Sequence, residues 1–138
     1  LGFALGNEEA IARLERVKGV MDFNQYAGIL RMGIAALKTP REVTRGFAQV
    51  YQKRALGMAE ALKGALDLLP PKATMYLWGK LPQGVDDLEF TLSVVERGVA
   101  VAPGRGFGPG GRGHVRIALV QPMEMLQEAA RILREALD

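Results

Sequence analysis

The sequence contains no cysteine and only one histidine, His114. Without cysteine there is no disulfide framework and no thiolate metal site. A single histidine argues against a histidine-based zinc site or a Ser-His-Asp triad formed within these residues alone. No apolar run approaches the roughly 20 residues that a membrane helix requires. The function classes that depend on those features are therefore disfavoured.

The sequence also begins at Leu1 without a methionine, and it does not begin with a basic segment followed by an apolar stretch, the pattern of a signal peptide. This start predicts a portion cut from a longer polypeptide. A length of 138 residues suits one compact domain, so we expect residues 1–138 to form a single domain. The 18 basic residues are scattered among 15 acidic ones, which does not single out nucleic acid as a partner.

The hydrophobic periodicity predicts helices in the first half and short strands in the second. We expect a short strand at 1–6, and helices from an Asn7 cap to Gly19, over 24–37, from a Thr39 cap to Leu69 before Pro70, from an Asp86 or Asp87 cap to Gly98, and from Pro122 to the end. Strands are expected at 74–80, 99–102 and 114–120. The fold class is α+β, with helices packed on a small mixed or antiparallel sheet.

Arg116 is the residue whose position most suggests chemistry. In the strand from His114, alternation sends Val115 and Ile117 to one face and Arg116 to the other. A guanidinium among apolar neighbours needs an anionic partner, because burying it unpaired is costly. A bound carboxylate or phosphate is one candidate, held in bidentate geometry. A structural pair with an acidic residue of the same fold is the other.

The loop from Pro103 to Gly113 contains six glycines and two prolines, so it is expected to lack regular structure. It has no Gly-Lys-Ser/Thr ending and is not a phosphate cradle of that type. Arg105-Gly106 and Arg112-Gly113 flank Phe107 and resemble weakly a nucleic-acid segment. The favoured interpretation is a tight excursion across the mouth of a cleft.

Two polar groups of residues allow both a structural and a functional reading. Asp86 and Asp87 are interpreted as a helix cap, with a general acid or base role as the alternative. Asn24, Gln25 and Tyr26 lie between two expected helices, where polar groups often line a site. Capping by Asp22 or Asn24 is the alternative there.

A family resemblance enters with the motifs of the second half. The run GVAVAPG at 98–104, then Phe107-Gly108, then GHVRIAL at 113–119, resembles the C-terminal signature of fold-type I aminotransferases of the aspartate aminotransferase class. The segment ATMYLW at 73–78 is similar to a strand of that family, with Ala73 where glycine is usual. Residues 1–6 resemble the strand that follows the family's lysine element. The likeness covers essentially the whole chain in the right order.

The resemblance implies the small C-terminal domain of a pyridoxal 5'-phosphate enzyme, with residues 1–6 left over from the large cofactor domain. Arg116 would bind the substrate α-carboxylate, and Asn24, Gln25 and Tyr26 would contact the substrate side chain. The implied protein is a homodimer that moves an amino group between an amino acid and a 2-oxo acid. Because the sequence shows no targeting segment and no apolar run of membrane length, we expect a cytoplasmic protein with neither nucleic acid nor membrane as partner.

The resemblance also implies what this portion lacks. The family's Schiff-base lysine and phosphate-binding arginine would precede Leu1, since no lysine here stands in a Ser-x-x-Lys context. We therefore expect no catalytic, cofactor-binding or metal-binding residue in these residues, and no transamination by this portion alone. The alternatives are a non-catalytic binding domain with an aminotransferase-like fold, and a nucleic-acid module built on Arg105 and Arg112.

Overall fold

The structure is a computed structural model that describes residues 1–68 and 71–137. The chain divides into two compact units, Leu1–Val43 and Thr44–Asp138. We describe each unit by itself.

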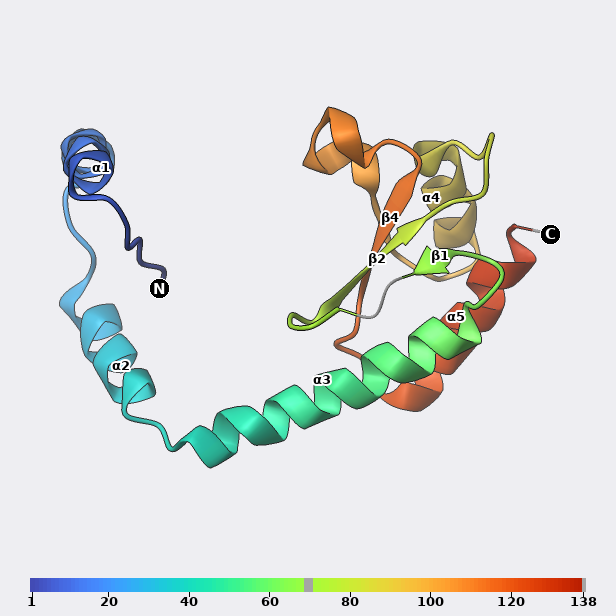
Figure 1. Cartoon of the computed structure of the whole chain (residues 1–138), viewed down its shortest axis with the longest axis horizontal. Coiled ribbons are helices and arrows are strands. Elements are labelled where there is room, and N and C mark those ends of the chain that lie inside the picture. Colours follow the sequence, from blue (N-terminus) through green and yellow to red (C-terminus); the bar gives the residue numbers. More distant parts are fainter. Residues whose placement is uncertain (69–70, 138) are drawn as a thin grey trace. The chain divides into compact units, whose positions relative to one another are not determined.

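The first unit contains two helices and the chain leading into them (Figure 1). Helix α1 spans Glu8–Met21, and the Asn7 side chain accepts a hydrogen bond from the Ala10 amide at 3.1 Å, as expected for its N-cap. Helix α2 spans Ala27–Leu37, so it begins three residues after the predicted start at Asn24. No residue of either helix is buried in this chain.

Residues 1–6 are not a strand in this structure, in contrast to the prediction. A strand is defined by hydrogen bonds to a neighbour, and no described segment pairs with these residues. Their pairing with another part of the protein stays a prediction.

Helix α3 spans Arg41–Ala61 and is shorter than the predicted helix from Thr39 to Leu69. The Arg134 guanidinium donates to the carbonyl oxygens of Ala61 at 3.1 Å and Lys63 at 2.8 Å, which satisfies carbonyls at the end of the helix. Gly64 then turns the chain with a φ of +82°. The predicted end of the helix at residues 69–70 lies outside the described residues.

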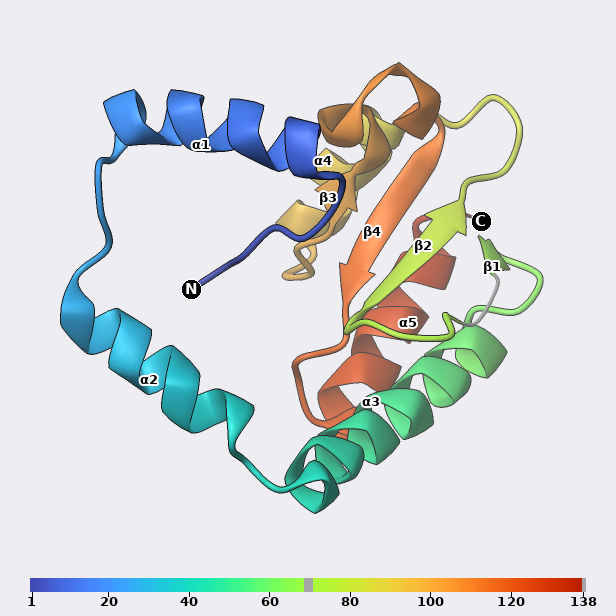
Figure 2. The same cartoon turned by 60° about the vertical axis from the view of Figure 1, so that its left-hand side comes forward.

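The second unit contains a sheet whose strands lie in the order β1-β2-β4-β3 (Figure 2). Its strands are β1 (Asp67–Leu68), β2 (Tyr76–Lys80), β3 (Ala102–Pro103) and β4 (His114–Ala118). Every neighbouring pair is antiparallel. The predicted strand at 99–102 is reduced to the two residues of β3, and Val99 instead donates to Val94 as the chain leaves a helix.

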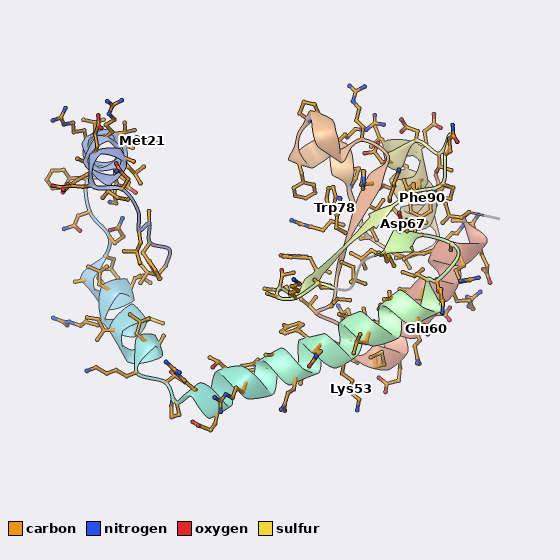
Figure 3. All side chains as sticks on the ribbon, viewed as in Figure 1. Met21, Lys53, Glu60, Asp67, Trp78 and Phe90 are labelled. Carbon is orange, nitrogen blue, oxygen red and sulfur yellow. The ribbon has the colours of Figure 1, made fainter. Side chains whose placement is uncertain are left out.

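Helices cover one face of this sheet. The core combines sheet residues with residues of α3, of α4 (Asp87–Glu96) and of α5 (Met123–Glu135). The buried side chains include Met58, Leu77, Phe90, Val94, Val115, Ile117, Leu126 and Leu133. Figure 3 shows Trp78 and Phe90 on opposite sides of the sheet. The predicted alternation along the Arg116 strand is confirmed, because Val115 and Ile117 are buried.

The glycine-rich segment is ordered into two short 3-10 helices, η1 (Gly104–Phe107) and η2 (Pro109–Gly111), so the expectation of no regular structure was wrong. The backbones of Gly104 and Gly111 come so close that a Cβ on either residue would lie about 2 Å from the other's carbonyl oxygen. Glycine at both positions is what lets the loop close on itself.

These elements confirm the α+β class with a small antiparallel sheet. Among the described residues, no helix has both the length and the apolar character needed to cross a membrane.

Candidate substrate-carboxylate site

Arg116 lies in the middle of β4, which is paired on both sides. Its Cα is opposite Trp78 of β2 and Ala102 of β3. A residue held by ladders on both edges has a well-defined backbone position. The side chain is half-buried and points to the face that the helices leave uncovered.

Two aromatic rings hold the Arg116 guanidinium. Its central carbon lies 4.3 Å from the Tyr76 ring centroid and 4.4 Å from the Phe107 ring centroid. Both distances are well within the range in which a cation is attracted to an aromatic face. The rings come from β2 and η1, so two separate segments fix one cation.

Among the described residues, the structure shows no acidic partner of the kind that we considered for Arg116. None of the ion pairs found within residues 1–68 and 71–137 includes Arg116. Aromatic rings neutralise no charge and occupy none of the in-plane N–H donors of a guanidinium. The arrangement therefore presents a positioned fork of donors, which matches a carboxylate in two parallel hydrogen bonds.

Further aromatic groups extend this face. Trp78 meets the Phe107 ring edge-on at 5.6 Å between centroids and stacks on the His114 ring at 5.4 Å. The His114 Nδ1 atom lies 3.0 Å from the Arg112 carbonyl oxygen. Because a carbonyl only accepts, Nδ1 is the donor there, and Nε2 is the acceptor in the neutral ring.

The carboxylate partners in this region belong to Arg105. Its Nε and Nη2 donate to Asp87 Oδ1 at 3.0 and 2.8 Å, its backbone N–H donates to Asp87 Oδ2 at 2.8 Å, and Nη2 also contacts Asp86. Hydrogen bonds from Arg105 hold the pKa of the Asp87 carboxyl well below its usual value, against the effect of burial. They also raise the pKa of Arg105.

The predicted capping role of the acidic pair is confirmed for Asp86 only. Its side chain accepts from the amides of Leu88 and Glu89 at 2.9 and 3.1 Å, and the Glu89 bond is the main cause of its lowered pKa. Asp87 is instead buried, at 1% exposed, and forms an ion pair with Arg105 that the sequence did not predict. The structure also engages Arg105 with carboxylates, so its guanidinium is not displayed for a nucleic acid.

Asn24, Gln25 and Tyr26 lie in the connection between α1 and α2, in the first unit, whereas Arg116 lies in the second. Asn24 Oδ1 accepts from the Gln25 backbone N–H at 2.9 Å, which is a local turn bond. Tyr26 is 79% exposed. Their contact with a substrate side chain stays a prediction.

Sequence reasoning missed the two rings around Arg116. Strand alternation places Tyr76 on the same face of its strand as Trp78, and this pattern could have indicated that both rings share one face of the sheet. Phe107 had none beyond its place in the motif, because its position depends on how the glycine-rich loop folds.

Comparisons with known proteins identify the family of this chain. The family model described as "Aminotransferase class I and II" matches residues 1–133. The chain is 39% identical over 136 residues to an LL-diaminopimelate aminotransferase of Aquifex aeolicus, covering 97% of this chain and 35% of that protein. It is 37% identical to one from Moorella thermoacetica, covering 99% of this chain and 36% of that protein. The chain thus spans about a third of the length of these relatives.

Solved structures share the fold. A probable N-succinyldiaminopimelate aminotransferase from Thermus thermophilus superposes with a TM-score of 0.88 and 77% identity, over 96% of this chain and 36% of that one. Substrate-bound BacF from Bacillus subtilis superposes with a TM-score of 0.80 and 26% identity, over 95% of this chain and 34% of that one. Because the family model matches nearly every residue in order, this chain belongs to the class I and II aminotransferase family.

Proposed function

We propose that this chain is the part of a pyridoxal-phosphate-dependent aminotransferase that binds the substrate α-carboxylate, with Arg116 as the carboxylate ligand. One observation carries the proposal: the Arg116 guanidinium lies between the rings of Tyr76 and Phe107, while the carboxylates of the region are paired with Arg105. The fork of Arg116 is positioned but not used by the described residues.

The chemistry gives this arginine a defined task. Two parallel hydrogen bonds to a carboxylate fix both its position and the direction of the bond to Cα. The substrate then turns less freely, so the Cα–H bond is held in one orientation for removal of its proton. The rings keep the guanidinium plane in place as the substrate binds and leaves.

Proteins of this family use pyridoxal phosphate, which supplies an electron sink for the Cα carbon when it is bound. The sequence has six lysines, and none of them stands in the family's Ser-x-x-Lys context. This chain therefore has a residue suited to bind the substrate carboxylate, Arg116, and no lysine in the context of the family's cofactor-binding lysine. We assign no step of cofactor chemistry to them.

The substrate class that we propose is a diaminopimelate-type amino acid. It is supported by similarity to LL-diaminopimelate aminotransferases and to a probable N-succinyldiaminopimelate aminotransferase. We further propose that the whole protein acts in amino-acid metabolism, in the cytoplasm and as a homodimer. In it, Asn24, Gln25 and Tyr26 would contact the distal part of the substrate.

The test uses the full-length protein with pyridoxal phosphate and two amino donors, LL-diaminopimelate and N-succinyl-LL-diaminopimelate. We expect amino transfer from at least one donor, and a fall in kcat/KM of roughly 10²-fold or more for Arg116→Gln, because charge-assisted hydrogen bonds to the carboxylate are lost. Arg116→Lys keeps the charge without the planar fork and should lose less.

Two results would contradict the proposal. A full-length protein that transfers no amino group from either donor, while it binds the cofactor, would remove the proposed activity on this substrate class. An Arg116→Gln protein with unchanged kcat/KM would remove the role of Arg116. As a control, the 138-residue chain mixed with pyridoxal phosphate should give neither transamination nor a cofactor adduct of defined stoichiometry.

A further inference from the structure

The Asp87 carboxylate binds both ends of the glycine-rich loop. Within the described residues, Asp87 is the only acidic side chain in the buried interior, at 1% exposed. Its Oδ2 atom accepts from the Arg105 backbone N–H at 2.8 Å, near the beginning of the loop. Its Oδ1 atom accepts from the Arg105 side chain and, in a longer contact of 3.4 Å, from the Gly113 N–H at the end of the loop.

The loop between those ends is a closed unit. Gly104 and Gly111 touch through their backbones, so η1 and η2 pack against each other with no room for a side chain. The loop is thus a compact unit that the Asp87 carboxylate contacts near its beginning and at its end. Nothing in this arrangement needs the loop to be flexible.

Phe107 is the side chain through which the loop reaches the candidate site. It ends η1 and is 51% exposed, so the core does not hold its ring in place. Its ring contacts are with Arg116, at 4.4 Å, and with Trp78, at 5.6 Å. Of the two rings next to the Arg116 cation, Phe107 thus belongs to the loop, whereas Tyr76 belongs to a paired strand.

We propose that Asp87 is a positioning residue of the carboxylate site, acting through Arg105 and Phe107 on Arg116. Asp87 holds the loop, the loop holds the Phe107 ring, and the ring limits the orientations of the guanidinium fork. This inference rests on the proposed function of Arg116. It adds that a buried residue on α4 sets how tightly the substrate carboxylate binds.

The test measures KM and kcat separately in the full-length protein, with the amino donor that proves active. Asp87→Asn keeps the side-chain shape but places an N–H group against the donors of Arg105, which loosens the loop. We expect KM to rise by about tenfold, the size typical of coupled contacts, with a smaller change in kcat. Glu128→Gln is the matched control, since it removes an exposed carboxylate–arginine pair of α5 and should leave KM unchanged.

A double-mutant cycle separates positioning from a general loss of structure. If Asp87 acts through the Phe107 ring, then Asp87→Asn should change KM little further in a Phe107→Leu protein. Two full, additive effects on KM would overturn the inference, as would a folded Asp87→Asn protein with unchanged KM. Should Asp87→Asn fail to fold, Arg105→Lys decides in its place, because it keeps a cation near Asp87 but loses the Nε and Nη2 bonds.

The result for Arg116→Gln keeps the two proposals apart. If Arg116→Gln leaves kcat/KM unchanged, the proposed carboxylate site fails, whatever Asp87 does. If Arg116→Gln lowers kcat/KM and a folded Asp87→Asn protein keeps its KM, only the positioning role of Asp87 fails.

Discussion

Arg105 and Arg116 lie in the same loop-and-strand region, and their surroundings differ in one respect that decides their roles. Arg105 is bound by Asp86 and Asp87, whereas Arg116 is bound by the rings of Tyr76 and Phe107. Carboxylates satisfy both the charge and the donors of a guanidinium, and rings satisfy neither fully. The comparison shows two arginines of one region with different partners, carboxylates for Arg105 and aromatic rings for Arg116, and our proposal for Arg116 rests on that difference.

The largest effect on stability should come from Arg105→Gln. It leaves the buried Asp87 carboxylate without its cation, which is a strongly destabilising kind of change. We expect Tm to fall by roughly 5 °C or more, while Arg116→Gln should leave Tm nearly unchanged. Thermal unfolding followed by circular dichroism measures both. Equal falls in Tm for the two variants would remove the distinction between the two arginines.

The pH dependence of stability should follow Asp87. Because its pKa is lowered in the fold, mainly by Arg105, the ionised carboxylate stabilises the folded state at pH values above the ordinary aspartate pKa of about 3.9. That contribution declines as the pH falls below this value toward the lowered pKa. The stability difference between the wild-type and Asp87→Asn proteins should therefore stay nearly constant from about pH 6 to about pH 4 and shrink as the pH falls from about 4 toward about 2 in urea unfolding. A constant difference down to about pH 2 would contradict the pairing.

Replacing a ring should weaken substrate binding by a moderate amount. Phe107→Leu keeps an apolar side chain but removes one cation–π contact of Arg116. We expect KM to rise by roughly 3- to 10-fold, since such contacts contribute on the order of 1 kcal/mol.

The smallest effect should come from Thr74, two residues before Tyr76. This β-branched residue has a φ of +81°, in the region that favours glycine. Thr74→Gly should stabilise the protein by up to about 1 kcal/mol, whereas Thr74→Ala should not, because alanine keeps the steric conflict. An unchanged KM in Thr74→Gly would show that the β2–β4 ladder, not this turn, sets the Tyr76 side of the site.

The features that depend only on the local sequence could be predicted. Strand alternation predicted that Val115 and Ile117 are buried and that Arg116 faces the other way. This prediction holds because the period of two is a property of the extended backbone itself. The Asn7 and Asp86 caps were predicted for the same reason, since a cap needs only its own helix.

The contacts that could not be predicted join distant segments. The end of α3 at Ala61 depends on Arg134, and the order of the glycine-rich loop depends on Asp87. The helical pattern up to Leu69 does not indicate that an arginine of α5 contacts the end of α3. The strand predicted at 1–6 illustrates the same limit, because a strand requires a neighbour that the local sequence does not specify.

The closed loop also determines which substitutions this protein can accept. A methyl group at Gly104 or Gly111 would collide with backbone atoms, whereas nothing lies within 4 Å of a Cβ placed at Gly106 or Gly110. In a saturation library, the first two positions should therefore return glycine alone, and the other two should return a broad set of residues. A short glycine-rich stretch would then divide into invariant positions and freely variable positions. Substitutions meant to reshape the surface next to Phe107 should therefore begin at Gly106 and Gly110.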